Sequence, residues 1–377
     1  MGPKKKKNTS GNGQNQKINK QIHVTPVRPG PNDHLPFVSI CTPTFNRRPF
    51  WEMAIKCFDE YDYPKDRMEW IIIDDGTDKV EDLVGHLPQV KYYKYDGQMI
   101  LGKKRNLMHD KSRGDIIIYQ DDDDYYPPER VSHAVQTLTA NPTALCAGSS
   151  IVYVYFKHIS QMYRFGPYGP NHATAGTFAF RRELLRQTRY EDTKAVAEEG
   201  YFLKGYTIPF VQLDPLKTIL VFPHIHNTCD KRELLVHAPN PTCNQDPDVS
   251  VNTILRNESI HQFFMKDIDD LLARYSPGDP KYKVEVNKQI AILKENNEKK
   301  REEHRKKKQE EAQRADTNKI VDDANKRVQE ERGKAIRVMV QNKKLLIKLR
   351  EYEKRLGIEP ADAFTEETDD MNVKLPR

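Results

Sequence analysis

The stretch GDIIIYQDDDDYYPPERV (residues 114–131) places an apolar run directly before four consecutive carboxylates, Asp121 to Asp124. Three isoleucines and a tyrosine predict a buried strand. Adjacent like charges raise one another's pKa values, so the cluster needs a positive partner. A divalent cation is one interpretation. The other is an acidic turn that caps a helix at PPERV, where Pro suits the first turn and acids suit the N-terminus.

Upstream of this stretch, apolar runs alternate with helix-like segments. FVSICTPTF (37–45), EWIIIDDG (69–76) and VKYYKY (90–95) are typical of strands, whereas PFWEMAIKCFDEY (49–61) and GKKRNLMHDKSR (102–113) have a helical pattern. This alternation predicts βαβ units and a Rossmann-like α/β sheet covered by helices on both faces. Ligands bind beyond the carboxyl ends of such strands. The polar residues TPTFNRR after the first strand, Asp74 and Asp75 after the second, and the four aspartates of the acidic stretch are therefore expected to converge on one crevice.

The second half of the chain is less regular. SSIVYVYF (149–156), TFAF (177–180) and TILVFPHIH (218–226) are strand-like, and DTKAVAEEGYFLKG (192–205) is helix-like. In TILVFPHIH the two histidines are two residues apart, which puts them on one face of a strand. Residues 231–284 are expected to be loop and irregular packing.

Composition limits the class of protein. The chain has 377 residues, 31% of them charged, and a formal net charge of +6, which is consistent with anionic partners such as phosphates. The five cysteines are scattered without a CxxC pair, which indicates reduced thiols. No apolar run reaches the roughly 18 to 20 residues of a membrane span, and the first thirty residues lack a signal peptide. We therefore expect a soluble, cytoplasmic protein.

Composition also predicts the domain organisation. Residues 1–34 are expected to be a disordered basic arm, 35–284 an α/β domain, 285–358 a charged helical or coiled-coil region and 359–377 a disordered tail. A 3-4 repeat in the third segment is typical of a coiled coil with one polar Asn in its seam. The repeat consists of Val321, Ala324, Val328, Glu331, Ala335, Val338, Asn342, Leu345, Leu349, Tyr352 and Leu356.

The helical segment has two interpretations. It forms a homo-oligomer, or it packs back on its own α/β domain. Glu331 in the seam and the helix-weakening Gly333 count against the coiled coil. Binding of nucleic acid through residues 1–20 and 294–314 is a weaker alternative, because the mixed charges of the second segment do not form a phosphate-tracking surface.

Four motifs occur in a recognisable order. They are VSICTPTFNR (38–47), IIIDDGTD (71–78), GKKRN (102–106) ahead of the acidic stretch, and AGTFAFRREL (175–184) followed by AEEGYFLKG (197–205). From Phe37 to about Asn227 the chain resembles a family 2 glycosyltransferase of the GT-A fold, of a type without membrane helices. The resemblance implies a Rossmann-like mixed sheet flanked by helices. The resemblance implies transfer of a sugar from a nucleotide sugar to a hydroxyl acceptor, with inversion at the anomeric carbon.

The resemblance assigns the nucleotide-binding residues. It places Pro43, Thr44, Phe45 and Asn46 in the loop that holds the base, with Phe45 offering a stacking face, and it gives Asp75 the hydrogen bond from uracil. The donor is therefore expected to be a UDP-sugar. Taken alone, Phe45 could equally pack in the core and Asp75 could be a turn residue.

In GKKRN, a helix N-terminus attracts anions. Lys104 and Arg105 can therefore face a diphosphate, or instead form a solvated basic face. Asn106 matches an Asn of the family pattern.

The acidic cluster is assigned to Mn²⁺ or Mg²⁺. Two carboxylates spaced D-x-D can grip one hard cation, and alignment on Pro128 favours Asp121, Asp123 and Asp124, whereas a shift by one makes Asp122 a ligand. The resemblance makes His226 a candidate to complete the metal or phosphate site, and a structural histidine is the alternative.

Glu198 and Glu199 occupy the place of the family's acidic pair. The resemblance makes the second acid, Glu199, the general base, with Glu where the family usually has Asp. The alternative is two acids on a solvated helix. Two other functions stay open: a nucleotidyltransferase with a similar D-x-D, and a non-catalytic scaffold whose coiled coil is the working part.

Overall fold

The computed structural model describes residues 32–236 and 243–359. The chain divides into two compact units, with the division between Ile292 and Leu293. The predicted arm of residues 1–34 lies outside the described residues except for 32–34, and so does the predicted tail except for Glu359.

The first unit contains a mixed sheet that, in the described residues, has seven strands in the order β3-β2-β1-β4-β8-β5-β9. The strands β1 to β4 are parallel to their neighbours in this group, whereas β8 runs antiparallel to β4 and β5. The predicted mixed α/β sheet is therefore confirmed. Its strands are β1 (Val38–Thr44), β2 (Met68–Asp74), β3 (Val90–Lys94), β4 (Ile116–Tyr119), β5 (Cys146–Gly148), β8 (Ala179–Arg181) and β9 (Phe210–Gln212).

A smaller sheet has the order β10-β6-β7-β11. Its strands are β6 (Val152–Phe156), β7 (Gln161–Phe165), β10 (Leu220–Val221) and β11 (Cys243–Asn244). The helices of the described chain are α1 (Trp51–Glu60), α2 (Glu81–Val84), α3 (Leu101–Lys111), α4 (Arg130–Ala140), α5 (Glu199–Phe202), α6 (Glu233–Val236), α7 (Val251–Ile254), α8 (Glu258–Gln262), α9 (Ile268–Ala273) and α10 (Val284–Leu356).

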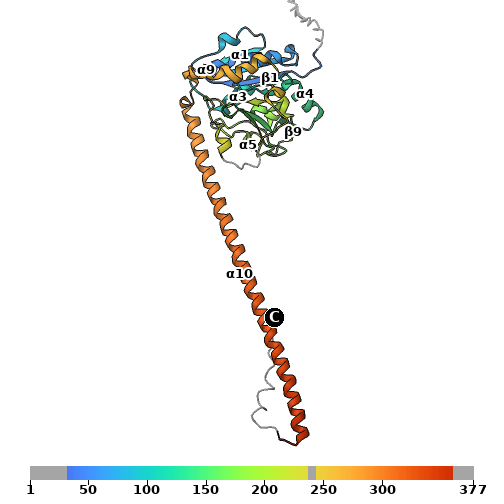
Figure 1. Ribbon diagram of the computed structural model, residues 1–377. Coiled ribbons are helices and arrows are strands. Elements are labelled where there is room, and N and C mark those ends of the chain that lie inside the picture. Colours follow the sequence, from blue (N-terminus) through green and yellow to red (C-terminus); the bar gives the residue numbers. More distant parts are fainter. Residues whose placement is uncertain (1–31, 237–242, 360–377) are drawn as a thin grey trace, which may run out of the picture. The chain divides into compact units, whose positions relative to one another are not determined.

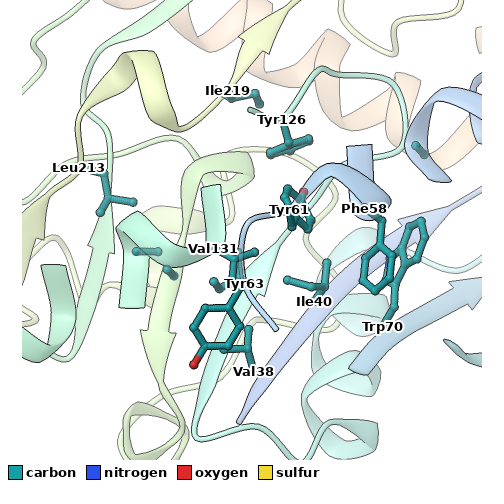
Figure 2. Close-up of a cluster of buried hydrophobic side chains, with 14 of the residues drawn as sticks. Val38, Ile40, Phe58, Tyr61, Tyr63, Trp70, Tyr126, Val131, Leu213 and Ile219 are labelled. Atoms are coloured by element: carbon teal, nitrogen blue, oxygen red, sulfur yellow. The ribbon is translucent and has the colours of Figure 1, made fainter. Parts of the chain in front are cut away.

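The central strands are buried on both faces because their side chains alternate. Val38 and Ile40 of β1 face a core shared with α1 and α4, and Figure 2 shows them near Phe58 and Val131. Cys41 lies in a second core, which includes residues of α3. On the first face the rings of Phe58 and Trp70 stack with centroids 4.6 Å apart, which ties α1 to β2 (Figure 2).

The prediction that residues 231–284 lack regular structure is wrong. The segment contains α7, α8 and α9, whose apolar side chains form a third core with Phe50 and Met53, and α9 lies near α1 in Figure 1. The four residues of α7 are too few to show a clear 3.6-residue period. The helices α8 and α9 are joined without a break by the π-helical segment Phe263–Asp267, whose wider turns interrupt that period.

Two local predictions also need correction. The helix expected over 192–205 is reduced to α5, because Ala197 has a φ of 53°, in the left-handed region that interrupts a helix. His224 and His226 lie in a turn beyond β10 and not on a strand. Pro223 follows β10 by two residues, and its missing N–H prevents further pairing there.

The helix α10 is a single helix of 73 residues with no buried side chain in the described structure, and Figure 1 draws it without a break. Of the helices that the structure describes, none combines the length and apolar composition needed to cross a bilayer.

Candidate active site

A cavity of about 230 Å³ opens at the carboxyl ends of β1 and β4. It brings together Phe45, Lys104, Arg105 and the start of the acidic cluster, as expected from the positions of these residues after parallel strands. Its described lining consists of Pro43, Phe45, Arg47, Gln98, Met99, Leu101, Lys104, Arg105, Asp121, Asp122, Asp123, Ala195, Val196, Thr228, Lys283 and Val286.

Cationic and imidazole side chains surround the carboxylates. The Arg47 Nε lies 3.8 Å from Asp122 Oδ1 and 3.6 Å from Asp123 Oδ2. The His224 Nε2 lies 3.1 Å from Asp123 Oδ2. His224 is buried, and burial lowers the pKa of its ring to about 4, which favours the neutral imidazole. It therefore contributes a hydrogen bond more than a charge.

The cluster is nevertheless short of positive charge. Asp122 Oδ2 and Asp124 Oδ1 are buried and have no hydrogen-bond partner in the described part of the chain, although Lys231 Nζ lies 3.8 Å from the second oxygen. Burial and the charge of Asp123 raise the pKa of Asp122. Burial also raises the pKa of Asp124, against the opposing effect of Lys231.

Carboxylate oxygens are the donors that Mg²⁺ and Mn²⁺ prefer, so the unsatisfied oxygens fit a divalent cation in their chemistry. Over the described residues, no three His, Cys, Asp or Glu side chains already converge on one point in metal-ligand geometry. The assignment of Asp121, Asp123 and Asp124 to a metal therefore stays a prediction.

Lys104 is already paired inside the fold. Its Nζ donates to Asp75 Oδ1 at 2.5 Å and to the Thr44 carbonyl oxygen at 3.1 Å. The other carboxylate oxygen of Asp75 accepts the backbone N–H of Met99. Asp75 is 1% exposed and lies behind the cavity lining, so its predicted contact with the base would require a shift of this pair.

Arg105 is likewise held in place by internal contacts. Its Nε donates to Glu198 Oε1 at 3.0 Å, and its guanidinium lies 4.5 Å from the ring centroid of Tyr119. Glu198 is buried, whereas Glu199, the first residue of α5, is half-buried. The two neighbouring acids thus have different surroundings.

Asn46 and Asn106, which were predicted to bind the nucleotide, hold neighbouring loops by hydrogen bonds and do not line the cavity. Asn46 Oδ1 accepts from the Asp78 N–H at 2.9 Å and its Nδ2 donates to the Pro277 carbonyl at 2.9 Å. Asn106 Nδ2 donates to the Tyr190 carbonyl at 2.9 Å, and its Oδ1 accepts the N–H of the same residue at 3.0 Å. Both therefore position loops around the cavity.

Although His226 follows His224 by only two residues, its contacts are different. Its carbonyl oxygen accepts from Arg47 Nη2 at 2.7 Å, and its ring centroid is 6.2 Å from that of Tyr275. It is His224 that reaches Asp123. The role of His226 in a metal site stays a prediction.

Sequence reasoning missed Arg47, Thr228 and Lys283. Lys283 Nζ donates to Thr228 Oγ1 at 2.8 Å, and both residues line the cavity with Arg47. Arg47 is the last residue of the recognised motif VSICTPTFNR, so it could have been predicted as a site residue from the sequence. Thr228 and Lys283 lie in segments without a periodic pattern, where only the tertiary fold brings them to the cavity.

Residues 39–189 match the model of the family described as Glycosyl transferase family 2. Among solved structures, the mannosyltransferase PcManGT from Pyrobaculum calidifontis, in complex with GDP-Man and Mn²⁺, has 19% identity and a TM-score of 0.41 over 49% of this chain and 56% of that chain. S. aureus TarS 1–349 has 16% identity and a TM-score of 0.41 over 49% of this chain and 60% of its own. The TarS complex with UDP-GlcNAc has 16% identity and a TM-score of 0.38, over 50% and 58% of the two chains.

The chain thus spans between 56% and 60% of the length of these three structures. No curated protein sequence matches it. The family match begins at Ser39 within β1 and extends past β8, so it covers the acidic cluster. Residues 39–189 of this chain therefore form a glycosyltransferase domain of family 2.

Proposed function

We propose that the first unit is an inverting glycosyltransferase that moves a sugar from a nucleotide sugar, with a UDP-sugar as the preferred donor, to an acceptor hydroxyl with the help of Mn²⁺ or Mg²⁺. The observation that carries this proposal is the shared cavity at the strand ends, where the half-buried ring of Phe45, three carboxylates and the basic side chains of Arg47 and Lys283 meet. The family match of the same segment supports it.

The nucleotide would lie across the carboxyl end of β1. Phe45 is half-buried and lines the cavity beside Pro43, so its ring face is available for stacking on a base. Asp75 and Lys104 hold the Met99 backbone and the end of β1 in place. In this proposal they shape the base pocket from behind.

Arg47 and Lys283 would bind the diphosphate. The two residues predicted for this task, Lys104 and Arg105, have their charges balanced by Asp75 and Glu198, and a neutralised cation attracts an anion weakly. Arg47 and Lys283 both line the cavity. Arg47 already contacts the carboxylates, and Lys283 donates only to a neutral hydroxyl in its described hydrogen bonds.

Asp121, Asp122 and Asp123 would hold the cation, since all three line the cavity. A divalent cation bound there supplies Lewis-acid polarisation of the leaving diphosphate. Arg47 and His224 orient the cluster through Asp122 and Asp123. Lys231 balances part of the remaining charge at Asp124.

Glu199 is the proposed general base. As the acceptor oxygen attacks the anomeric carbon, its proton passes to the Glu199 carboxylate and the bond between the sugar and the diphosphate breaks. One in-line displacement of this kind inverts the anomeric centre. Glu198 keeps its ion pair with Arg105 and stays outside the proton transfer.

The working compartment is proposed to be cytoplasmic. Cys41, Cys57 and Cys146 are buried free thiols, which suits a reducing environment.

A nucleotide screen tests the proposal. Thermal unfolding of the full chain is measured with UDP, UDP-hexoses and GDP-sugars, each with Mn²⁺ or with a chelator, and products are identified by chromatography. We expect metal-dependent stabilisation by UDP and slow release of free UDP from a UDP-sugar. Asp123→Asn should lose the metal-dependent shift, whereas the exposed Asp270→Asn should keep it.

Two outcomes contradict the proposal. Release of pyrophosphate would indicate a nucleotidyltransferase. No stabilisation by any nucleotide, with or without metal, would favour a scaffold.

A further inference from the structure

The second unit carries an exposed apolar stripe along α10. Its a-type and d-type positions from Val321 to Leu356 follow a strict 3-4 spacing. The Val, Leu and Tyr side chains of the stripe are 50% to 72% exposed. Single exposed apolar residues are ordinary, but a continuous stripe of this length marks an interaction surface.

Two halves of this stripe differ in side-chain size. The N-terminal half has small or β-branched residues, among them Ala324, Val328 and Ala335, and the C-terminal half has larger ones, among them Leu345 and Leu349. A parallel, in-register pair would place small against small and large against large. An antiparallel pair places small against large, which is the arrangement that fills a core without voids.

The polar residues of the stripe also favour an antiparallel pair. A parallel pair would put Glu331 opposite Glu331 of the second copy, and burying two like charges is costly. An antiparallel register that pairs a-type with d-type positions, in which paired residue numbers add up to 673, puts Glu331 opposite Asn342. An Asn side-chain N–H can donate to a carboxylate, so each polar group supplies the partner that the other lacks.

We infer that α10 forms an antiparallel two-stranded coiled coil with a second copy of this chain, in the register that pairs Glu331 with Asn342. The remaining layers of this register pair Val321 with Tyr352, Ala324 with Leu349, Val328 with Leu345 and Ala335 with Val338, and the terminal Leu356 lies opposite Thr317. Each layer occurs twice, because the register is its own reverse.

The area is sufficient for a specific pair. Covering roughly 60 Å² on each apolar side chain of the stripe buries roughly 1,000 Å² in total, the lower limit for a specific interface. A second copy fits this surface better than a helix of another sequence, because both the size gradient and the polar pair are self-complementary. The inference is independent of the proposed enzymatic function.

The oligomeric state of the full chain is the first test. Sedimentation equilibrium under reducing conditions should show a concentration-dependent dimer. Leu345→Lys places a charge in the stripe and should shift the chain to monomer. Ile347→Lys makes the same change two residues away, on the outer face of the helix, and should leave the dimer intact. A monomeric wild-type chain, a trimer or tetramer, or equal effects of both variants would overturn the inference.

Disulfide cross-linking tests the orientation with small substitutions. In the inferred register the two copies of residue 321 are roughly 46 Å apart, from a rise of about 1.5 Å per residue. Val321→Cys alone should therefore not link to itself. A mixture of Val321→Cys and Tyr352→Cys chains should yield a linked peptide that joins 321 to 352, identified by mass spectrometry against the wild-type background of native cysteines. Efficient self-linkage of Val321→Cys would establish the parallel form instead.

Discussion

Glu198 and Glu199 are adjacent in the chain but have different partners. Glu198 is 5% exposed and pairs with Arg105 at 3.0 Å, while Glu199 is half-buried at the start of α5. Removing one member of a buried ion pair leaves the other charge uncompensated. Glu198 is therefore expected to matter for stability and Glu199 for catalysis.

Paired substitutions separate these two roles. Glu199→Gln is expected to lower kcat by roughly 10²-fold to 10⁴-fold, the usual contribution of a general base, with an unchanged free energy of unfolding. Glu198→Gln is expected to lower the free energy of unfolding by about 3 kcal/mol, because Arg105 loses its partner. Urea unfolding and initial rates measure both effects. Loss of kcat in Glu198→Gln at full stability would reverse the assignment.

The buried His109 is expected to make the free energy of unfolding depend on pH. Its ring is buried, its Nε2 lies 2.6 Å from the Tyr119 hydroxyl, and burial together with the charge of Arg105 lowers its pKa to about 3. In the unfolded chain a histidine has a pKa of about 6.5. The unfolded state therefore binds the proton more readily below that pH, and the contribution of His109 to stability is full above about 6.5 and lost as the pH falls towards 3.

The corresponding experiment is chemical unfolding between pH 7 and pH 5. The wild-type free energy of unfolding should fall with a component of up to about 1.4 kcal/mol per pH unit. His109→Gln should lack this component even if its stability at pH 7 is lower. The exposed His86→Gln is the matched control and should follow the wild-type curve. Parallel curves for wild type and His109→Gln would exclude this residue as the acid-sensitive group.

At the scale of elements, the start of α3 is shaped by the loop that faces it. The Gly102 N–H donates to the Lys194 carbonyl at 2.9 Å, and a Cβ on Gly102 would clash with the carbonyl oxygen of Glu191. Ala195 and Val196 of the same loop line the cavity. The glycine thus permits a close approach of helix and loop that forms one wall of the candidate active site.

Replacement of Gly102 by alanine should lower stability, whereas the same replacement in a helix usually raises it. Alanine in place of glycine normally stabilises a helix by about 1 kcal/mol, but Gly102→Ala should destabilise the first unit and weaken nucleotide binding, since it displaces the loop. In α10, a Cβ on Gly333 meets no atom within 4 Å in the described structure. Gly333→Ala should therefore raise the thermal stability of that helix, measured by circular dichroism. A stabilising Gly102→Ala would contradict the packing argument.

At the scale of the whole molecule, the division after Ile292 leaves all the described residues of the cavity lining within the first unit. A residue beyond the cavity also contributes, because Gln289 donates to the Thr193 carbonyl at 2.8 Å and accepts the Ala195 N–H at 2.9 Å. The first turns of α10 thus belong to the candidate active site.

Truncation tests this division. A chain that ends at Ile292 should bind UDP in the presence of Mn²⁺ as tightly as the full chain, and it should be monomeric. A chain that ends at Tyr282 lacks Lys283 and Gln289, and its affinity for UDP should fall by roughly tenfold or more, because a hydrogen bond to a charged group contributes about 1.5–3 kcal/mol. Calorimetric titration measures both. Equal affinity of the two truncated chains would remove Lys283 from the diphosphate site.

Local signals in the sequence were enough to predict the central sheet. The alternation of apolar residues in β1, β2 and β4, with helical patterns between them, required two covered faces, and the positions of Phe45 and Asp121 after parallel strands predicted that they would meet. The long charged helix was also predicted correctly, because its pattern extends over many turns. The four-residue helix α7 gave no such signal, and the π-helical segment Phe263–Asp267 interrupts the helical period between α8 and α9.

What the sequence alone determined is which chemical groups are present and at which edge of the sheet they gather, since hydrophobic periodicity and strand direction are properties of neighbouring residues. Only the tertiary structure decided which charges remain available. Lys104 is neutralised by Asp75, 29 residues away, and Arg105 by Glu198, 93 residues away, while Lys283 enters the cavity from the far end of the unit. Whether a charge is free depends on its spatial neighbours, and no pattern within a short stretch of chain encodes them.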